Sequence, residues 1–284
     1  MSKVPEITKS TGEREVFQTE KLEKSLARAG ANKEAIDEIV AEISEWLVDG
    51  VTTKKIYTKA FNLLKKKRNS YAARYSLKKA LMELGPTGFP FEHFVGQVFA
   101  IQGFDTKVGQ IVQGQCVQHE VDVVATQNHT QYLVECKYYN SQEKHANVQV
   151  PLYIRSRVND IEAKRRQLPE YNGYTFYGWI VTNTRFTTDA MDFGKCSGLH
   201  LVSWDYPKGH SLKDMIDTYK MFPITVLTGL GKREKQLLMD KGVVLCRQLA
   251  ENSKTLNTLG LTESKIVSIL KEVHDLTNGK SLIK

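Results

Sequence analysis

Two short segments in the middle of this chain alternate apolar and polar residues, and only a few turn-forming residues separate them. They lie in the stretch HEVDVVATQNHTQYLVECKYY, residues 119–139. Val121, Val123 and Ala125 share one face of the first segment, because side chains in a strand point alternately to opposite sides. The polar residues between the segments predict a hairpin. A chain with this element must build part of its core around an antiparallel strand pair.

The expected register of this hairpin places two acids opposite each other. A four-residue loop at 127–130 would put Asp122 directly across from Glu135. Opposed Cβ atoms are about 4.5–5.5 Å apart, and like charges at that distance destabilise a sheet. A divalent cation offsets this repulsion, so the pair predicts a site for Mg²⁺ or Mn²⁺. Lys137 lies about 7 Å further along the same face, where its ammonium group can act on a water molecule or on a phosphate.

A second interpretation of the same residues needs no metal. In the same register Lys137 faces Glu120, so the two form an ordinary cross-strand ion pair, and Asp122 and Glu135 are solvated acids at the rim of the sheet. From the residues alone, Glu92 fits equally well as a helix-surface acid.

Three differently patterned segments follow one another along the 284 residues, and we expect three domains. Residues 1–85 have the three- and four-residue apolar spacing of helices, over 20–47 and 53–83, and GPTGFP at 85–90 ends them. Residues 86–221 mix helical runs with short strand-like runs, which predicts an α/β sheet packed between helices. Residues 222–284 return to helical spacing. The helices expected in the central segment are Phe91–Gln102, Pro151–Leu168 and Thr187–Lys195.

Composition favours a globular chain with a polyanionic partner. Hydrophobic residues are 41% and charged residues 25%, which argues against disorder. No apolar run is long enough to span a membrane, and the amino terminus lacks the apolar core of a signal peptide, so we expect a cytoplasmic protein with no membrane partner. The four cysteines lack zinc-site spacing and are expected to be reduced thiols. The net charge of +8 divides into +5, −1 and +4 over the three segments, which predicts that the flanking domains attract DNA.

The central motifs resemble the PD-(D/E)xK restriction-endonuclease-like superfamily, in its Mrr-like branch. A helix with Glu92, the strand VDVVA with Asp122 and the strand LVECK with Glu135 and Lys137 occur in the order of that family. Gln149 matches its downstream glutamine, and WIVTNTRFTTDAMDFGKCSGLHLVSW resembles its closing strand, helix and strand. The resemblance implies a central mixed sheet flanked by helices and a nuclease that cleaves DNA. It also implies that Asp122 and Glu135 bind the metal. Lys137 would then assist the attacking water, with Glu92 and Gln149 supporting the site.

The amino-terminal segment resembles an ATP-cone, a nucleotide-sensing module that is mainly helical. The resemblance implies that Lys9, Lys21 and Arg28 contact the phosphates of ATP or dATP, which would act as an effector. A helical DNA-binding or dimerising bundle is the alternative, and the basic run at 65–68 favours it. The matching segments are ITKSTGEREVF, TEKLEKSLARAG and AARYSLKKAL, at residues 7–17, 19–30 and 72–81.

The carboxy-terminal segment contains a weak repeat, in which GLGKREKQLL from Gly229 aligns with GLTESKIVSIL from Gly260. Two helical hairpins in tandem are expected. In the first copy Gly229, Gly231 and Lys232 precede a helix, so backbone N–H groups and the helix amino terminus could receive a phosphate. The copy resembles a helix-hairpin-helix, which implies sequence-independent contact with the DNA backbone. A purely structural or protein-docking hairpin is the alternative.

These observations together predict a Mg²⁺-dependent DNA endonuclease of restriction type, regulated by adenine nucleotide. Two alternatives stay open: a DNA repair or junction-cleaving nuclease, and a non-catalytic ATP-sensing regulator that binds DNA. The presence of Asp122, Glu135 and Lys137 disfavours the regulator. A homo-oligomer is compatible with the sequence, which does not define the target sequence or base modification.

Overall fold

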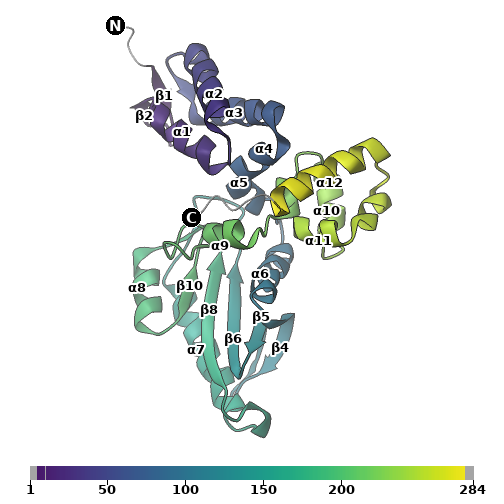
Figure 1. Ribbon diagram of the computed structural model, residues 1–284. Helices are drawn as coiled ribbons and strands as arrows, with labels where there is room; N and C mark the ends of the chain where they lie inside the picture. Colours follow the sequence, from purple (N-terminus) through teal and green to yellow (C-terminus); the bar gives the residue numbers. More distant parts are fainter. Residues whose placement is uncertain (1–4, 10, 279–284) are drawn as a thin grey trace.

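The computed structural model of the chain describes residues 5–9 and 11–278. Figure 1 shows three units: an amino-terminal unit, a larger unit built on a sheet, and a carboxy-terminal helical unit beside the first two. Ser10, in the segment ITKSTGEREVF that resembles part of an ATP-cone, lies outside the described residues. Within the described part of the chain, no helix combines the length and the apolar character needed to cross a membrane. All four cysteines are free, as predicted.

The amino-terminal unit packs a small sheet against short helices. Its strands are ordered β2–β1–β3, with β1 antiparallel to β2 and parallel to β3. The two long helical stretches expected from the sequence divide into five helices, with Leu26, Ile43 and Leu64 fully buried between them. The elements are β1 (Glu6–Thr8), β2 (Arg14–Val16), α1 (Thr19–Arg28), α2 (Lys33–Trp46), β3 (Val51–Thr52), α3 (Thr53–Lys67), α4 (Asn69–Tyr75) and α5 (Leu77–Leu81).

The central unit confirms the predicted mixed sheet flanked by helices. Its five strands are ordered β10–β8–β6–β5–β4; β4, β5 and β6 are antiparallel neighbours, and β6, β8 and β10 run parallel. The elements are α6 (Phe89–Ile101), β4 (Asp105–Gln113), β5 (Gln118–Gln127), β6 (Thr130–Lys137), β7 (His145–Ala146), α7 (Gln149–Arg165), η1 (Pro169–Tyr171), β8 (Thr175–Thr182), β9 (Arg185–Phe186), α8 (Thr188–Cys196), β10 (His200–Val202) and α9 (Leu212–Tyr219).

The β5–β6 hairpin has the predicted register with a shorter loop. The strands pair from Gln127 with Thr130 to Val123 with Val134, so the loop has two residues and not four. Both loop residues, Asn128 and His129, have positive φ angles of 46° and 60°. Such a two-residue loop matches the twist of the flanking strands. The pairing is unchanged because the two extra residues of the expected loop form one further pair.

Helices cover both faces of the sheet, and the three expected central helices are confirmed as α6, α7 and α8 with slightly shifted ends. One face packs against α6, whose Phe91 and Phe94 are fully buried. The other face contacts α7 through Ile154 and Ile161. Figure 1 shows both helices against the central strands.

The carboxy-terminal unit contains the weak repeat as two copies of a 3₁₀ helix followed by an α-helix. The starts of α10 and α12, Lys232 and Glu263, are 31 residues apart, as the alignment requires. A 3₁₀ helix thus replaces the first helix of each expected hairpin, and α11 lies between the copies. The elements are η2 (Ile224–Val226), α10 (Lys232–Met239), α11 (Cys246–Glu251), η3 (Ser253–Leu259) and α12 (Glu263–Thr277).

The carboxy-terminal unit is attached to the amino-terminal unit by specific polar contacts. The Thr225 hydroxyl donates a hydrogen bond to the Ala80 carbonyl at 2.8 Å, in a buried position. The Arg68 guanidinium makes a two-point ion pair with Asp275, with N···O distances of 2.7 and 3.0 Å. A forked contact of this kind fixes orientation as well as distance.

Candidate active site

Asp122 and Glu135 are adjacent acids on the inner strands β5 and β6. The register puts them next to the pair formed by Val123 and Val134, and the Cys136 amide donates a hydrogen bond of 2.6 Å to the Asp122 carboxylate. Glu135 is buried, with 6% of its surface exposed. Burial, followed by the negative charge of Glu135, raises the pKa of Asp122 to about 7. The Asp122 carboxyl group is therefore costly to ionise at this position.

Two basic side chains flank the Glu135 carboxylate. The Lys137 ammonium lies 2.5 Å from one oxygen, and the Arg157 guanidinium donates to the other. Burial lowers the pKa of Lys137, but its hydrogen bond to Glu135 and the negative charges of Glu135 and Asp122 together outweigh this effect, and the net pKa is raised. In the described chain the ion-pair partner of Lys137 is Glu135, so the structure does not contain the alternative pair with Glu120.

Arg157 is the residue of this cluster that the sequence analysis did not select. It lies on α7 and also donates a hydrogen bond of 2.9 Å to the Tyr153 hydroxyl. Gln149, Tyr153 and Arg157 are spaced four residues apart, which places them on one helix face. That spacing was available in the sequence, but nothing local indicated that this face would meet Glu135.

The two supporting residues differ in their positions. Glu92, in the first turn of α6, has a raised pKa because it is partly buried and because Glu120 and Glu135 are negatively charged. Its carboxyl group is thus electrostatically coupled to the acid pair. Gln149 is exposed at the start of α7, and within residues 5–9 and 11–278 its side chain makes no hydrogen bond. In that part of the chain no hydrogen bond links the Gln149 side chain to the acid pair, and its supporting role stays a prediction.

The donor set fits a hard divalent cation. Mg²⁺ is commonly held by one or two carboxylates, with water and substrate phosphate completing its shell. Asp122 and Glu135 supply two carboxylates, and the raised pKa of Asp122 marks the charge that a cation would stabilise. In the part of the chain that the structure describes, no group of three or more His, Cys, Asp or Glu side chains could enclose a metal ion. The site is therefore suited to a cation shared with water and substrate, not to an all-protein cage.

The expected nucleotide residues fall in two places. Lys9 and Lys21 both approach the Glu15 carboxylate, with N···O distances of 3.1 and 3.4 Å. Arg28 lies at the far end of α1, in a cavity next to the central unit. The structure therefore brings Lys9 and Lys21 together and leaves Arg28 apart from them.

The loop before α10 differs from the sequence expectation. The amides of Thr228 and Gly229 donate hydrogen bonds of 2.9 and 3.3 Å to the buried Glu272 carboxylate of α12. An internal carboxylate thus stands where a DNA phosphate was expected, so the Gly229 amide is not free. Gly231 and Lys232 are exposed. No local pattern could reveal Glu272, which lies 43 residues beyond Gly229.

The central unit has a five-stranded mixed sheet with helices on both faces, and its inner strands carry two adjacent acids and a lysine. These features together define the restriction-endonuclease-like class of proteins. Family models match three consecutive segments: an ATP cone domain at residues 5–82, a restriction endonuclease domain of the Mrr type at 86–206, and an AF1548-like C-terminal domain at 222–277. The three matches occur in the order predicted from the sequence.

Comparisons with known proteins and solved structures find further similar chains. An uncharacterised protein of Archaeoglobus fulgidus is 32% identical over 171 residues, which are 60% of this chain and 92% of that protein. The crystal structure of AF1548, a protein of unknown function, superposes with a TM-score of 0.55 at 29% identity and covers 68% of this chain and 100% of that one. The MspJI restriction endonuclease in complex with a 27-mer oligonucleotide has a TM-score of 0.33 at 12% identity, and the match covers 61% of this chain and 36% of that one.

The chain belongs to one family with the Archaeoglobus fulgidus protein, and it combines an amino-terminal ATP cone domain, a restriction endonuclease domain of the Mrr type and an AF1548-like carboxy-terminal domain. These matches support a nuclease that carries a nucleotide-binding module.

Proposed function

We propose that this protein is a Mg²⁺- or Mn²⁺-dependent endonuclease that hydrolyses phosphodiester bonds in DNA, and that adenine nucleotide regulates it. The observation that carries the proposal is the buried acid pair with an ammonium group beside it. Asp122 and Glu135 occupy adjacent positions on neighbouring strands, and Lys137 lies 2.5 Å from Glu135. Burying like charges together costs free energy. Such a costly arrangement is typical of functional sites, where the reaction and not stability determines the residues.

In this mechanism Asp122 and Glu135 hold the divalent cation, which supplies Lewis-acid stabilisation of the phosphate and a more acidic bound water. The raised pKa of Lys137 keeps its side chain protonated at neutral pH. We therefore assign Lys137 to orienting the attacking water and stabilising the negative charge that develops on the phosphate, and not to removing a proton. Arg157 holds the Glu135 carboxylate in position from α7. Glu92 lies close enough to the acid pair to favour the binding of positive charge.

Plasmid cleavage tests the proposal. We expect Asp122→Asn and Lys137→Met each to reduce Mg²⁺-dependent cleavage by roughly 10²–10⁴-fold, with DNA binding in a gel-shift assay largely retained. Asp105→Asn and Lys107→Met are matched controls, because these residues are exposed on the β4 edge strand of the same sheet. Full cleavage by either site variant, or cleavage in EDTA, would contradict the proposal.

A substrate panel separates restriction from repair. The same assay on plasmid, methylated plasmid and branched DNA compares the substrates of the two classes of nuclease. Preference for either plasmid form is the result that we expect of a restriction-type enzyme. Selective cleavage of branched DNA would instead assign the protein to junction processing.

For the nucleotide, we propose that ATP or dATP phosphates bind between Lys9 and Lys21 and replace the Glu15 carboxylate. The ATP-cone match and the convergence of the two lysines on one acid support this assignment. Calorimetric titration of ATP should give binding that Lys9→Gln and Lys21→Gln weaken, whereas Lys24→Gln, exposed on the same helix as Lys21, should not. Titration of the wild-type protein without heat or change in assembly would contradict it.

For DNA, we propose that Lys232 contacts the phosphate backbone from the exposed start of α10. The nearby backbone amides of Thr228 and Gly229 already donate hydrogen bonds to Glu272. The proposed contact with DNA phosphate is therefore made by the Lys232 ammonium group. Lys232→Gln should weaken binding to all DNA sequences alike and reduce the slope of affinity against salt. A loss confined to one sequence would argue against a backbone contact.

A further inference from the structure

A small cavity lies where the ATP-cone domain meets the central unit. It has a volume of about 170 Å³. Figure 1 shows α9 at the end of the sheet that faces α5 and the amino-terminal helices. The aromatic, basic and acidic residues that line this cavity and carry the argument are Arg28, Arg74 and Lys78 from the ATP-cone domain, and Trp204, Lys213 and Asp217 from the central unit.

The side chains that line the cavity carry more positive than negative charge. Four of its side chains are cationic, whereas Asp217 is its one acid. Within residues 5–9 and 11–278, no ion pair shorter than 4.0 Å includes Arg28, Arg74, Lys78 or Lys213. The Arg74 Nε atom is buried and, in the same residues, has no hydrogen-bond partner. Both Arg74 and Lys78 are half-buried, and burial lowers the pKa of each because it removes part of the water around the cation.

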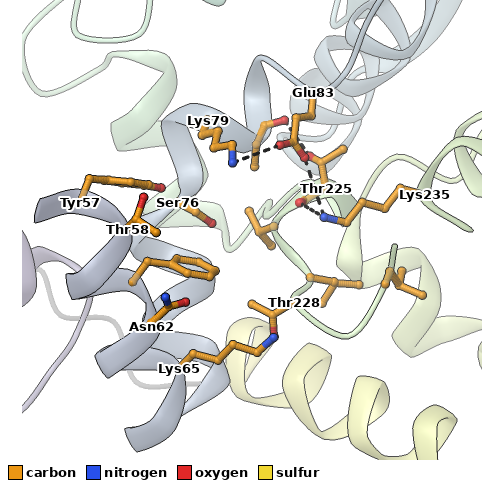
Figure 2. Close-up of a pocket in the computed structure, with 15 residues that line it drawn as sticks. Tyr57, Thr58, Asn62, Lys65, Ser76, Lys79, Glu83, Thr225, Thr228 and Lys235 are labelled. Carbon is orange, nitrogen blue, oxygen red and sulfur yellow. Dashed lines mark hydrogen bonds and ion pairs between the residues drawn. The ribbon is translucent and has the colours of Figure 1, made fainter. Parts of the chain in front are cut away.

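The larger cavity between the ATP-cone and carboxy-terminal domains is different. It has a volume of about 370 Å³, and Figure 2 shows Lys79 and Lys235 pointing toward Glu83. Their ammonium groups lie 3.9 and 3.8 Å from that carboxylate, and Lys235 also donates a hydrogen bond of 2.6 Å to the Thr225 carbonyl. Two of its lysines therefore have internal partners. The larger cavity thus has a carboxylate between two of its three lysines, whereas in the described residues none of the four cations of the smaller cavity has an ion-pair partner.

Collecting partly buried cations costs free energy unless an anion accompanies them. Guanidinium groups present forked donors that match phosphate oxygens, and ammonium groups add further donors. The volume is below the several hundred Å³ of pockets that enclose whole drug-sized ligands, so it suits a chain of phosphates and not an entire nucleotide. Arg28 and Arg74 line the cavity from the ATP-cone domain and Lys213 lines it from the central unit, so one ligand can contact both domains.

We propose that this cavity binds a phosphate chain of the pyrophosphate or triphosphate class and thereby joins the ATP-cone domain to the restriction-endonuclease-like domain. The chain is either inorganic polyphosphate or the phosphate portion of a nucleotide whose base stays outside. This site is distinct from the Lys9 and Lys21 cluster, and it does not depend on DNA cleavage.

Trp204 provides a direct test, because it lines the cavity and is one of only three tryptophans in the chain. Inorganic triphosphate titrated into the full-length protein should change tryptophan fluorescence and release or absorb heat in calorimetry. Trp204→Phe should remove the fluorescence change and keep the heat. Arg28→Gln and Lys213→Gln should each weaken the affinity by about tenfold, as expected for the loss of one charge-assisted contact. The two variants lie on opposite sides of the junction.

Matched control variants distinguish binding in this cavity from a general attraction between the basic protein and an anion. Lys24→Gln on α1 and Lys208→Gln in the loop before α9 remove exposed charges outside the cavity and should leave the affinity unchanged. Absence of triphosphate binding, or equal weakening by the control and cavity variants, would overturn the proposal.

Parallel titrations with ATP and adenosine identify the source of the phosphates. If Lys213→Gln weakens ATP and triphosphate alike, and adenosine does not bind at the cavity, the ligand is the phosphate tail of a nucleotide. If Lys213→Gln weakens triphosphate alone, the ligand is inorganic polyphosphate. Either result supports a phosphate-chain site, and neither requires that the nuclease proposal hold.

Discussion

Replacing Asp122 by asparagine should stabilise the metal-free protein at alkaline pH. The substitution keeps an oxygen that can accept the hydrogen bond from the Cys136 amide, which is 2.6 Å long in the structure. It removes the negative charge that burial and Glu135 disfavour. Proteins commonly lose stability at functional sites in this way, and removing the functional group then recovers it.

The magnitude follows from the pKa. A free aspartate has a pKa of about 3.9, and raising a pKa by 1 corresponds to about 1.4 kcal/mol of free energy. With the pKa of Asp122 at about 7 in the folded state, the free-energy penalty of ionising it there is at most about 4 kcal/mol. The folded state holds its proton more tightly than the unfolded state does. The penalty is therefore absent below about pH 4, grows as the pH rises, and is complete above about pH 7.

Urea unfolding in EDTA measures this difference. We expect Asp122→Asn to be more stable than the wild type by about 2–4 kcal/mol at pH 8.5, with a higher unfolding midpoint, and to match the wild type near pH 4. Added Mg²⁺ should stabilise the wild type and leave the variant unchanged. Glu120→Gln, an exposed charge on the same strand, is the control and should change little at either pH. Equal or lower stability of Asp122→Asn at pH 8.5 would refute the reasoning.

Three further predictions concern packing and charge. Gly229→Ala places a Cβ atom 2.8 Å from an isoleucine side-chain carbon, so chemical denaturation should show a loss of about 1–3 kcal/mol. The hydrogen bond from His119 lowers the pKa of Asp160 to about 2, so its charge stabilises the fold above about pH 4 and less as the pH falls toward 2. Circular dichroism should show Asp160→Asn destabilised at pH 7 and equal to wild type near pH 2. Arg157→Met leaves the buried Glu135 carboxylate with one cation fewer, so thermal unfolding in EDTA should report a loss of about 3–5 kcal/mol that Arg157→Lys partly restores.

The hairpin and its acid pair could be predicted because they depend on local rules. Alternation with a period of two assigns the faces of β5 and β6, and a short loop between them leaves few registers. The predicted loop is two residues too long, yet Asp122 still lies next to Glu135, because hairpin pairs of one register extend symmetrically from the turn. The central helices are predicted equally well, since their apolar spacing spans several turns.

Other features depend on elements that are distant in the chain. Arg157 reaches Glu135 only because α7 packs across the sheet, and Glu272 fills the expected phosphate position only because α12 packs against the loop before α10. The cavity that gathers Arg28 and Lys213 exists only because α1 and α9 meet at a domain junction. Periodicity and turn chemistry act over a few residues and are visible in the amino-acid order. Which helix face meets which strand depends on the packing of the whole core, so the partners of the charged groups became known only from the folded chain.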